Sequence, residues 1–144
     1  MIKVAPFLLF YGQCTNAIAL YEKAFEAKVI ELLRYSDANP KDKVKEGIAE
    51  NDIDKNLVYH AQIKIGSQRI CMCDAAGDGS PKEPSMSIIV TFETADAVKA
   101  AHEIMSEGAT IVDPMCSTTY SSCCVSLIDK FGVHWWLMTE QTKK

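Results

Sequence analysis

Three histidines and six cysteines are the side chains of this chain best suited to catalysis or to binding a transition metal. His60 lies in "VYHAQIK" and His134 in "GVHWWL", and both segments have the composition of strands. An imidazole can carry a proton near neutral pH, bind a metal or hydrogen-bond a ligand. We interpret His60 and His134 as candidate ligand-facing residues, with a structural hydrogen bond as the alternative for each. His102 lies on the polar side of a predicted helix and is interpreted as a surface residue.

The cysteines could supply a nucleophile, a soft-metal ligand or a disulfide. Their spacings are C-x-C and C-C, without the paired C-x-x-C of structural zinc sites. A chain of this length without a secretory signal is expected to keep its thiols reduced. Cys71 and Cys73 share one face of "RICMCD", where a small apolar side chain is the favoured interpretation and a reactive thiol the alternative. The six are Cys14, Cys71, Cys73, Cys116, Cys123 and Cys124.

Length and charge exclude several classes of protein. The 144 residues fit one domain, and the net charge of -4 provides no basic surface, so nucleic acid is not an expected partner. The longest apolar run, "VAPFLLFY" at residues 4–11, is far shorter than the roughly 18 to 20 residues that span a membrane. We expect a first strand there, in a cytoplasmic protein that does not contact membranes.

The elements that must position these side chains occur twice in the same order. In the first half, a strand at 4–11 precedes a helix at 15–25, for which Thr15 or Asn16 is the predicted cap. Three strands follow, at 28–36, 58–66 and 69–74, and a tight turn at Gly66 and Ser67 joins the last two.

The second half repeats strand, helix and three strands. The strand at 85–93 precedes a helix that Thr94 caps and Gly108 ends, and strands at 109–114, 121–129 and 133–140 close the module. The sequence predicts a single domain over 1–144, with module one at about 1–76 and module two at about 84–144.

This tandem βαβββ order, with "PFLLFYGQCTNAIALYEKAFEAKV", "YHAQIKIG" and "DKFGVHWWL", resembles the PhnB-like branch of the glyoxalase/bleomycin-resistance/dioxygenase (vicinal oxygen chelate) superfamily. The phrase Asp-x-Phe-Gly-Val-x-Trp, from Asp129 to Trp135, is the most specific part. The resemblance implies an α+β fold in which two tandem βαβββ modules form curved mixed sheets around a cavity. It also implies a homodimer. Members that catalyse reactions hold a divalent metal between the first and last strands of the modules, as a Lewis acid.

The ligands of that metal are missing from the expected positions. In the first strands of the two modules, residues 1–11 and 85–92 include no His, Asp, Glu or Cys. Metal-using relatives place a glutamate four residues after the glycine that opens the last strand, and four residues after Gly132 this chain has Trp136. We therefore predict no metal and no cofactor. Alternation along the last strand places His134 and Trp136 on the cavity side and Trp135 beneath the helix.

The leading prediction is a metal-free protein that binds a small molecule. One alternative is a metal-dependent lyase, isomerase or dioxygenase with atypical ligands such as His60, His134 and the cysteines. Another is an antibiotic-sequestering resistance protein. A methyltransferase label that some relatives carry is set aside, because no glycine-rich strand-to-helix turn is present. Whether the protein is an enzyme stays open. The predicted cavity-lining residues are His60, Cys71, Cys73, Tyr120, His134 and Trp136.

Overall fold

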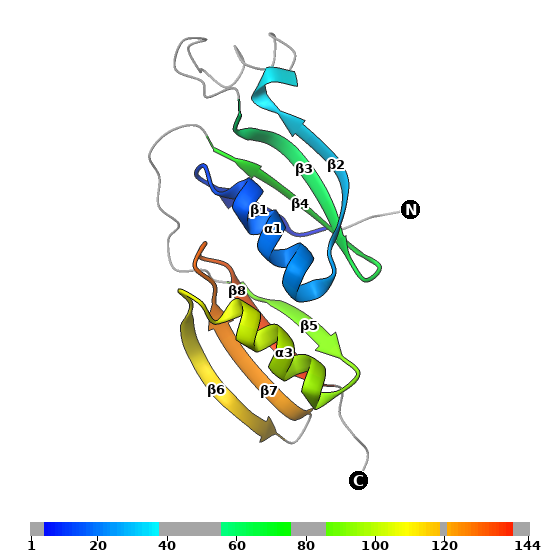
Figure 1. Ribbon diagram of the computed structural model, residues 1–144, viewed down its shortest axis with the longest axis vertical. Coiled ribbons are helices and arrows are strands. Elements are labelled where there is room, and N and C mark those ends of the chain that lie inside the picture. The colour runs from blue at the N-terminus through cyan, green and yellow to red at the C-terminus, as the bar shows by residue number, and fades with distance from the viewer. Residues whose placement is uncertain (1–4, 38–55, 76–85, 119–120, 140–144) are drawn as a thin grey trace. The chain divides into compact units, whose positions relative to one another are not determined.

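The computed structural model describes residues 5–37, 56–75, 86–118 and 121–139. The chain divides into two compact units, Met1–Pro81 and Lys82–Lys144. Within the described residues, each unit contains a four-stranded sheet with one α-helix against one of its faces (Figure 1).

Unit one is formed by β1 (Phe7–Phe10), α1 (Cys14–Phe25), β2 (Lys28–Arg34), the 3-10 helix η1 (Tyr35–Asp37), β3 (Val58–Ile65) and β4 (Gln68–Asp74). The strand order is β1-β4-β3-β2, with β1 parallel to β4 and the other pairs antiparallel. The helix connects β1 to β2 and packs on β3 and β4.

Unit two repeats this arrangement with β5 (Ile88–Phe92), α3 (Ala95–Met105), β6 (Thr110–Thr118), β7 (Ser121–Ile128) and β8 (His134–Thr139). The strand order β5-β8-β7-β6 again has a parallel first pair and two antiparallel pairs. The helix packs on β8, β7 and β5. The predicted α+β fold class with two tandem βαβββ modules and mixed sheets is confirmed.

Each helix buries one apolar stripe against its sheet. In α3 the buried residues are Val98, Ala101 and Met105, at helical spacing. Thr94 caps this helix as predicted, because its Oγ1 accepts a hydrogen bond of 3.1 Å from the backbone N–H of Ala97. In α1 the buried residues are Cys14, Ala17, Ile18, Tyr21, Ala24 and Phe25.

The predicted cap of α1 is wrong. The helix begins at Cys14, one residue before Thr15, and the residue that precedes it, Gln13, makes no capping hydrogen bond with its side chain. The acceptor is instead the buried carboxylate of Asp74 at the end of β4, whose Oδ1 receives the N–H groups of Gly12 and Cys14 at 2.9 and 3.0 Å. The start of α1 is therefore capped by a side chain of β4.

The second departure is β6, which runs to Thr118 although the prediction ended the strand at residue 114. Pro114 has no N–H to donate to a neighbouring strand. β6 is an edge strand, and its register with β7 shifts between Asp113 and Cys116. An edge strand with an irregular register accommodates proline and continues beyond it.

Candidate functional site

Each sheet has one face that its helix does not cover, called here the open face. In unit one, the residues buried toward α1 include Ala61 and Ile63 of β3 and Ile70 and Met72 of β4. Side chains alternate along a strand, so the residues between them belong to the open face. They are His60, Gln62, Arg69, Cys71 and Cys73, all partly exposed.

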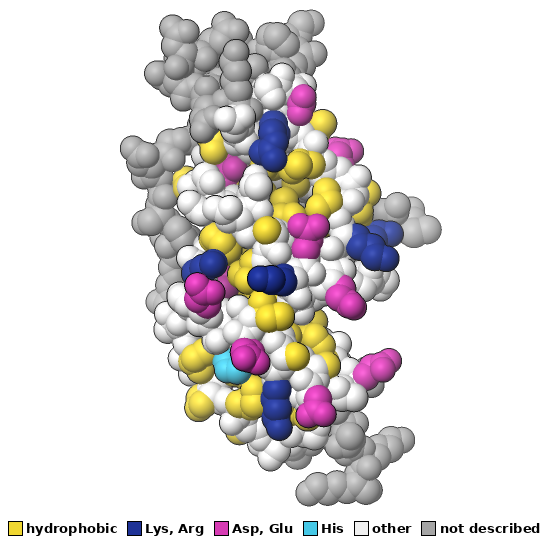
Figure 2. Space-filling model, in the orientation of Figure 1, with side chains coloured by type: hydrophobic (Ala, Val, Ile, Leu, Met, Phe, Trp, Pro, Cys, Tyr) yellow, Lys and Arg dark blue, Asp and Glu magenta, His cyan; other side chains and the backbone are white. Residues whose placement is uncertain are grey.

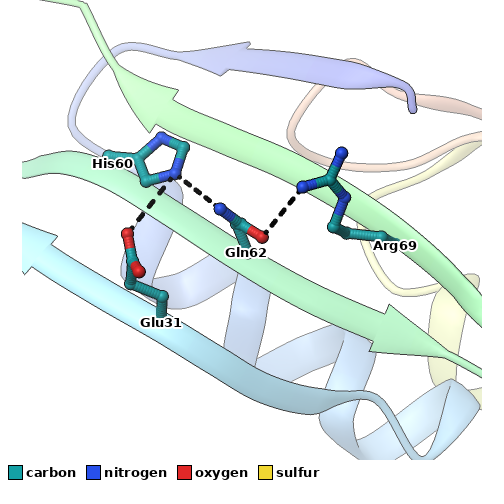
Figure 3. A network of polar contacts seen from close by, with 4 residues as sticks. All are labelled: Glu31, His60, Gln62 and Arg69. Carbon is teal, nitrogen blue, oxygen red and sulfur yellow. Dashed lines mark hydrogen bonds and ion pairs between the residues drawn. The ribbon is translucent and has the colours of Figure 1, made fainter. Parts of the chain in front are cut away.

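His60 belongs to a chain of polar contacts that crosses three strands (Figure 3). Its Nε2 lies 3.1 Å from the amide nitrogen of Gln62 and 3.6 Å from a carboxylate oxygen of Glu31. Arg69 donates to the Gln62 side-chain oxygen at 3.3 Å. This bond orients the amide so that its NH2 group points at His60. The network holds the imidazole between the Gln62 amide and the Glu31 carboxylate.

Cys71 and Cys73 lie beside this network on β4. Cys71 is paired with Gln62 of β3 on one side and with Phe7 of β1 on the other, and Cys73 is paired with Leu9. Phe7 and Leu9 are 58% and 46% exposed, so this side of the open face is apolar. The two thiols are half-buried, whereas the sequence favoured small buried apolar side chains.

In unit two the open face holds a second polar cluster, formed by Asp113, Ser126 and His134. The hydroxyl of Ser126, which is fully buried, donates to Asp113 Oδ2 at 2.7 Å. His134 Nε2 lies 3.4 Å from the same hydroxyl oxygen. Since the serine proton points at the carboxylate, this contact has His134 donating to Ser126. The cluster spans β6, β7 and β8.

Trp136 lies next to this cluster on β8. Its ring centroid is 6.2 Å from that of His134, with the rings tilted by 34°. Trp136 is paired with Ser126 on β7 and with Ile89 on β5, and Ile89 is 60% exposed. Trp135 and Leu137 are fully buried on the helix side, as the alternation predicts. The open face of unit two thus combines an indole, an apolar edge and three polar groups.

The structure therefore places the predicted site residues in two sets. His60, Cys71 and Cys73 share the open face of unit one, and His134 and Trp136 share that of unit two. Tyr120 lies outside the described residues. The sequence did not predict Asp113 and Ser126 as the polar neighbours of His134. It also did not predict that Gln62 connects His60 to Arg69. A further departure is His102, which is half-buried, with an Nδ1 that has no hydrogen-bond partner among the described residues.

The divalent metal implied by the superfamily can be tested against the donor set. Across residues 5–37, 56–75, 86–118 and 121–139, no three His, Cys, Asp or Glu side chains are grouped so that they could hold a metal ion. The first strands read "FLLF" and "IIVTF", and Trp136 stands at the position where the resemblance implies a glutamate in metal-using relatives. The residues that the structure describes do not fit such a metal.

The specific phrase from Asp129 to Trp135 forms a turn. Asp129 is 3% exposed, and its Oδ1 accepts from the backbone N–H of Phe131 and Val133 at 2.9 and 3.0 Å. Its Oδ2 accepts from the indole nitrogen of Trp135 at 2.9 Å. Gly132 has a φ of 92°, a conformation that strongly favours glycine. Asp, Gly and Trp in this phrase therefore secure the entry to β8.

One thiol is chemically distinct. Cys14, at the start of α1, is fully buried. Burial raises the pKa of its thiol from 9.0 to about 12, and the nearby Asp74 carboxylate and Cys73 add to the rise. Since the thiolate is the nucleophilic form, Cys14 is protonated and unreactive at neutral pH.

This shift predicts an alkaline loss of stability that depends on Cys14. Between pH 9 and about 12 the unfolded thiol loses its proton while the folded thiol keeps it. The unfolded state then binds fewer protons, so the free energy of unfolding falls by up to about 1.4 kcal/mol per pH unit, and below pH 9 the effect vanishes. Urea titrations at several pH values, on wild type and on Cys14→Ala, measure it. Equal slopes above pH 9 in both proteins would contradict the prediction.

A family model described as 3-demethylubiquinone-9 3-methyltransferase matches residues 2–138. The chain belongs to this family. The predicted resemblance to the PhnB-like branch of the glyoxalase/bleomycin-resistance/dioxygenase superfamily is confirmed. Of the helices in the described ranges, none has the length and apolar composition that crossing a membrane requires.

Individual members and structures agree with this assignment. Protein YjdN of Escherichia coli (strain K12) is 23% identical over 137 residues, which cover 92% of this chain and 91% of YjdN. The structure of a putative 3-demethylubiquinone-9 3-methyltransferase, PhnB protein, from Bacillus cereus is 24% identical, covers 96% of this chain and 99% of its own, and has a TM-score of 0.77. A glyoxylase/bleomycin resistance protein/dioxygenase domain from Frankia sp. EAN1pec is 11% identical, covers 100% of this chain and 96% of its own, and has a TM-score of 0.65. At these identities the structures establish the fold.

Proposed function

We propose that this family member binds a small organic molecule on the open face of unit two, without a divalent metal. The observation that carries the proposal is the Asp113, Ser126 and His134 cluster beside the partly exposed Trp136. Ligand sites combine apolar and aromatic surface with a few oriented polar groups, and this face has both.

Each part of the cluster has a role in this proposal. The indole of Trp136 and the side chain of Ile89 offer a surface on which a flat or apolar group can pack. Asp113 is partly exposed and offers a carboxylate to an N–H or O–H group of the ligand. His134 contributes a ring nitrogen whose proton position follows from its contact with Ser126. The ligand we propose is therefore a molecule with an aromatic or apolar part and a polar donor group.

The order of the three polar groups favours binding over nucleophilic catalysis. In a serine triad the histidine lies between serine and carboxylate and accepts the serine proton. Here Ser126 lies between His134 and Asp113, and it donates to the carboxylate. The hydroxyl is also fully buried, so a substrate carbonyl has no direct approach to it.

The remaining candidate residues lie outside this site and stay predictions. His60, Cys71 and Cys73 lie on the open face of unit one, where the polar network and the exposed Phe7 could also contact a ligand. The cavity-lining role of Tyr120 is predicted from the sequence alone. A homodimer and a cytoplasmic location also remain predictions. An antibiotic-sequestering role is also a prediction. Metal chemistry with atypical ligands is another, and the described residues offer no group of three donors for it.

Methyl transfer, which the family description names, is not part of the proposal. The turn from β1 to α1 is "YGQ", with one glycine, whereas the common methyltransferase fold cradles its cofactor in a glycine-rich strand-to-helix turn. Here β1 is moreover an edge strand of a four-stranded sheet.

Replacing Trp136 by alanine is expected to weaken ligand binding by about tenfold or more, because an aromatic contact and its buried area contribute about 1.4 kcal/mol. A library of small aromatic compounds, screened by thermal shift and then titrated by calorimetry, provides the ligands. Binding that persists in a metal chelator agrees with the proposal.

The matched control is Ile111→Ala. Ile111 is 42% exposed in the same unit, and it is paired with Leu127, which is buried on the helix side. This variant should bind as wild type does. A stoichiometric zinc, nickel or manganese ion that activates a lyase reaction would contradict the proposal. Equal ligand affinities of the Trp136→Ala variant and the wild type would also contradict it.

A further inference from the structure

Three cations form a row on the open face of unit one. Lys28 of β2 is paired with Lys64 of β3, and Lys64 is paired with Arg69 of β4. Directly paired residues of neighbouring strands point to the same face, with Cβ atoms about 4.5 to 5.5 Å apart. The neighbours Ile63 and Ile70 are buried toward the helix, so the row lies on the opposite, open face.

Such a row opposes stability in the absence of a ligand. Like charges directly opposite one another in a sheet are destabilising. The helix side of unit one, drawn in Figure 2, instead has Lys and Arg interspersed with Asp and Glu. Glu31, the acidic residue next to the row on β2, lies 3.6 Å from His60 Nε2. Its carboxylate is thus directed toward the imidazole.

One member of the row is oriented by the network already described. Arg69 is partly buried and donates one N–H from Nη1 to Gln62 Oε1. A guanidinium has five N–H donors in a planar fork that matches the oxygens of carboxylates and phosphates. Lys64 is exposed on the neighbouring strand, and the exposed Lys28 lies one strand further along the row. A guanidinium fork followed by two ammonium groups is an arrangement suited to a doubly charged oxyanion.

We propose that the Lys28, Lys64 and Arg69 row binds an oxyanion, with phosphate as the group that fits it best. Arg69 provides the directional hydrogen bonds and the lysines the charge. The site is in unit one, whereas the site of the proposed function is in unit two, so either can fail without the other. A ligand of this face would carry a phosphate or a comparable dianionic group.

Calorimetric titration with inorganic phosphate at low ionic strength tests this site. Wild type is expected to bind phosphate and to show a higher Tm in its presence. Lys64→Gln and Arg69→Gln should each weaken binding by about tenfold, as expected for losing one charged hydrogen bond in such a site. Lys64→Gln should also raise the Tm of the phosphate-free protein, because it removes like-charge repulsion, and this gain shows that the variant folds.

Lys23→Gln is the matched control. Lys23 is an exposed cation of α1, in the same unit but on the helix, and its loss changes the net charge by the same amount. The proposal is upheld if this variant binds phosphate as wild type does. It is overturned if wild type shows no saturable phosphate binding, or if Lys23→Gln weakens binding as much as Lys64→Gln. Acetate in place of phosphate should bind at least tenfold more weakly, and equal binding would overturn the preference for a dianion.

Discussion

Replacing Asp74 by asparagine is expected to lower the free energy of unfolding by about 3 to 5 kcal/mol. The carboxylate is 1% exposed and accepts three backbone N–H groups, from Gly12, Cys14 and Val58, at 2.9 to 3.0 Å. An asparagine has one oxygen and one NH2 group, so at least one of these N–H groups would face a donor. Two segments, the start of α1 and the start of β3, lose their common anchor at once.

Chemical denaturation followed by circular dichroism measures this loss. Asp37→Asn is the control, because the Asp37 carboxylate is exposed and, among the described residues, accepts one N–H, from Arg34 at 3.0 Å. Its expected cost is below about 1 kcal/mol. Equal losses in the two variants would show that the buried carboxylate of Asp74 does not hold the start of α1, and the account of this helix would then be wrong.

The second large effect is expected at the turn before β8. Asp129→Ala removes the acceptor of two backbone N–H groups and of the Trp135 indole, and should cost about 3 to 4 kcal/mol. Trp135→Phe keeps an aromatic ring in the fully buried position but loses the indole N–H. Because both variants remove the same hydrogen bond, the double variant should be more stable than the sum of the single losses predicts, by about 1 kcal/mol or more.

A double-mutant cycle from urea denaturation measures this coupling. Trp136→Phe is the control, since the neighbouring tryptophan lies on the open face and its indole is not bonded to Asp129. It should cost less than about 1 kcal/mol and add to Asp129→Ala without coupling. Additive losses for Asp129 and Trp135 would contradict the structural role assigned to this phrase.

The two helix starts show which local features a sequence can predict. Thr94 caps α3 through a hydrogen bond to a residue three positions away, and such a contact is visible in the sequence as a spacing. The cap of α1 is Asp74, which is 60 residues from Cys14. No local pattern connects these two positions, so the sequence favoured the nearby hydroxyl and amide side chains instead.

The candidate site likewise has features that a local sequence pattern predicts and contacts that it does not. Alternation along β3 and β8 predicted the faces of His60, Trp135 and Trp136, because the side-chain period of a strand is two. The partners of the histidines were not predicted. Ser126 meets Asp113 through a register that shifts on both sides of Asp113, and Glu31 meets His60 across strands whose register shifts between Val29 and Glu31.

The sequence by itself determined the α+β class, the repeated order of elements, the family and the absence of a carboxylate from the Trp136 position. These depend on composition, period and residue identity along the chain. Only the tertiary structure decided that Asp129 secures a turn, that Asp74 caps a distant helix, that Ser126 joins His134 to Asp113 and that three cations form one row. Asp129 bonds residues two to six positions away, and the closing of that turn decides those contacts. The other contacts depend on strand register, which is set by the packing of whole strands and by local bulges.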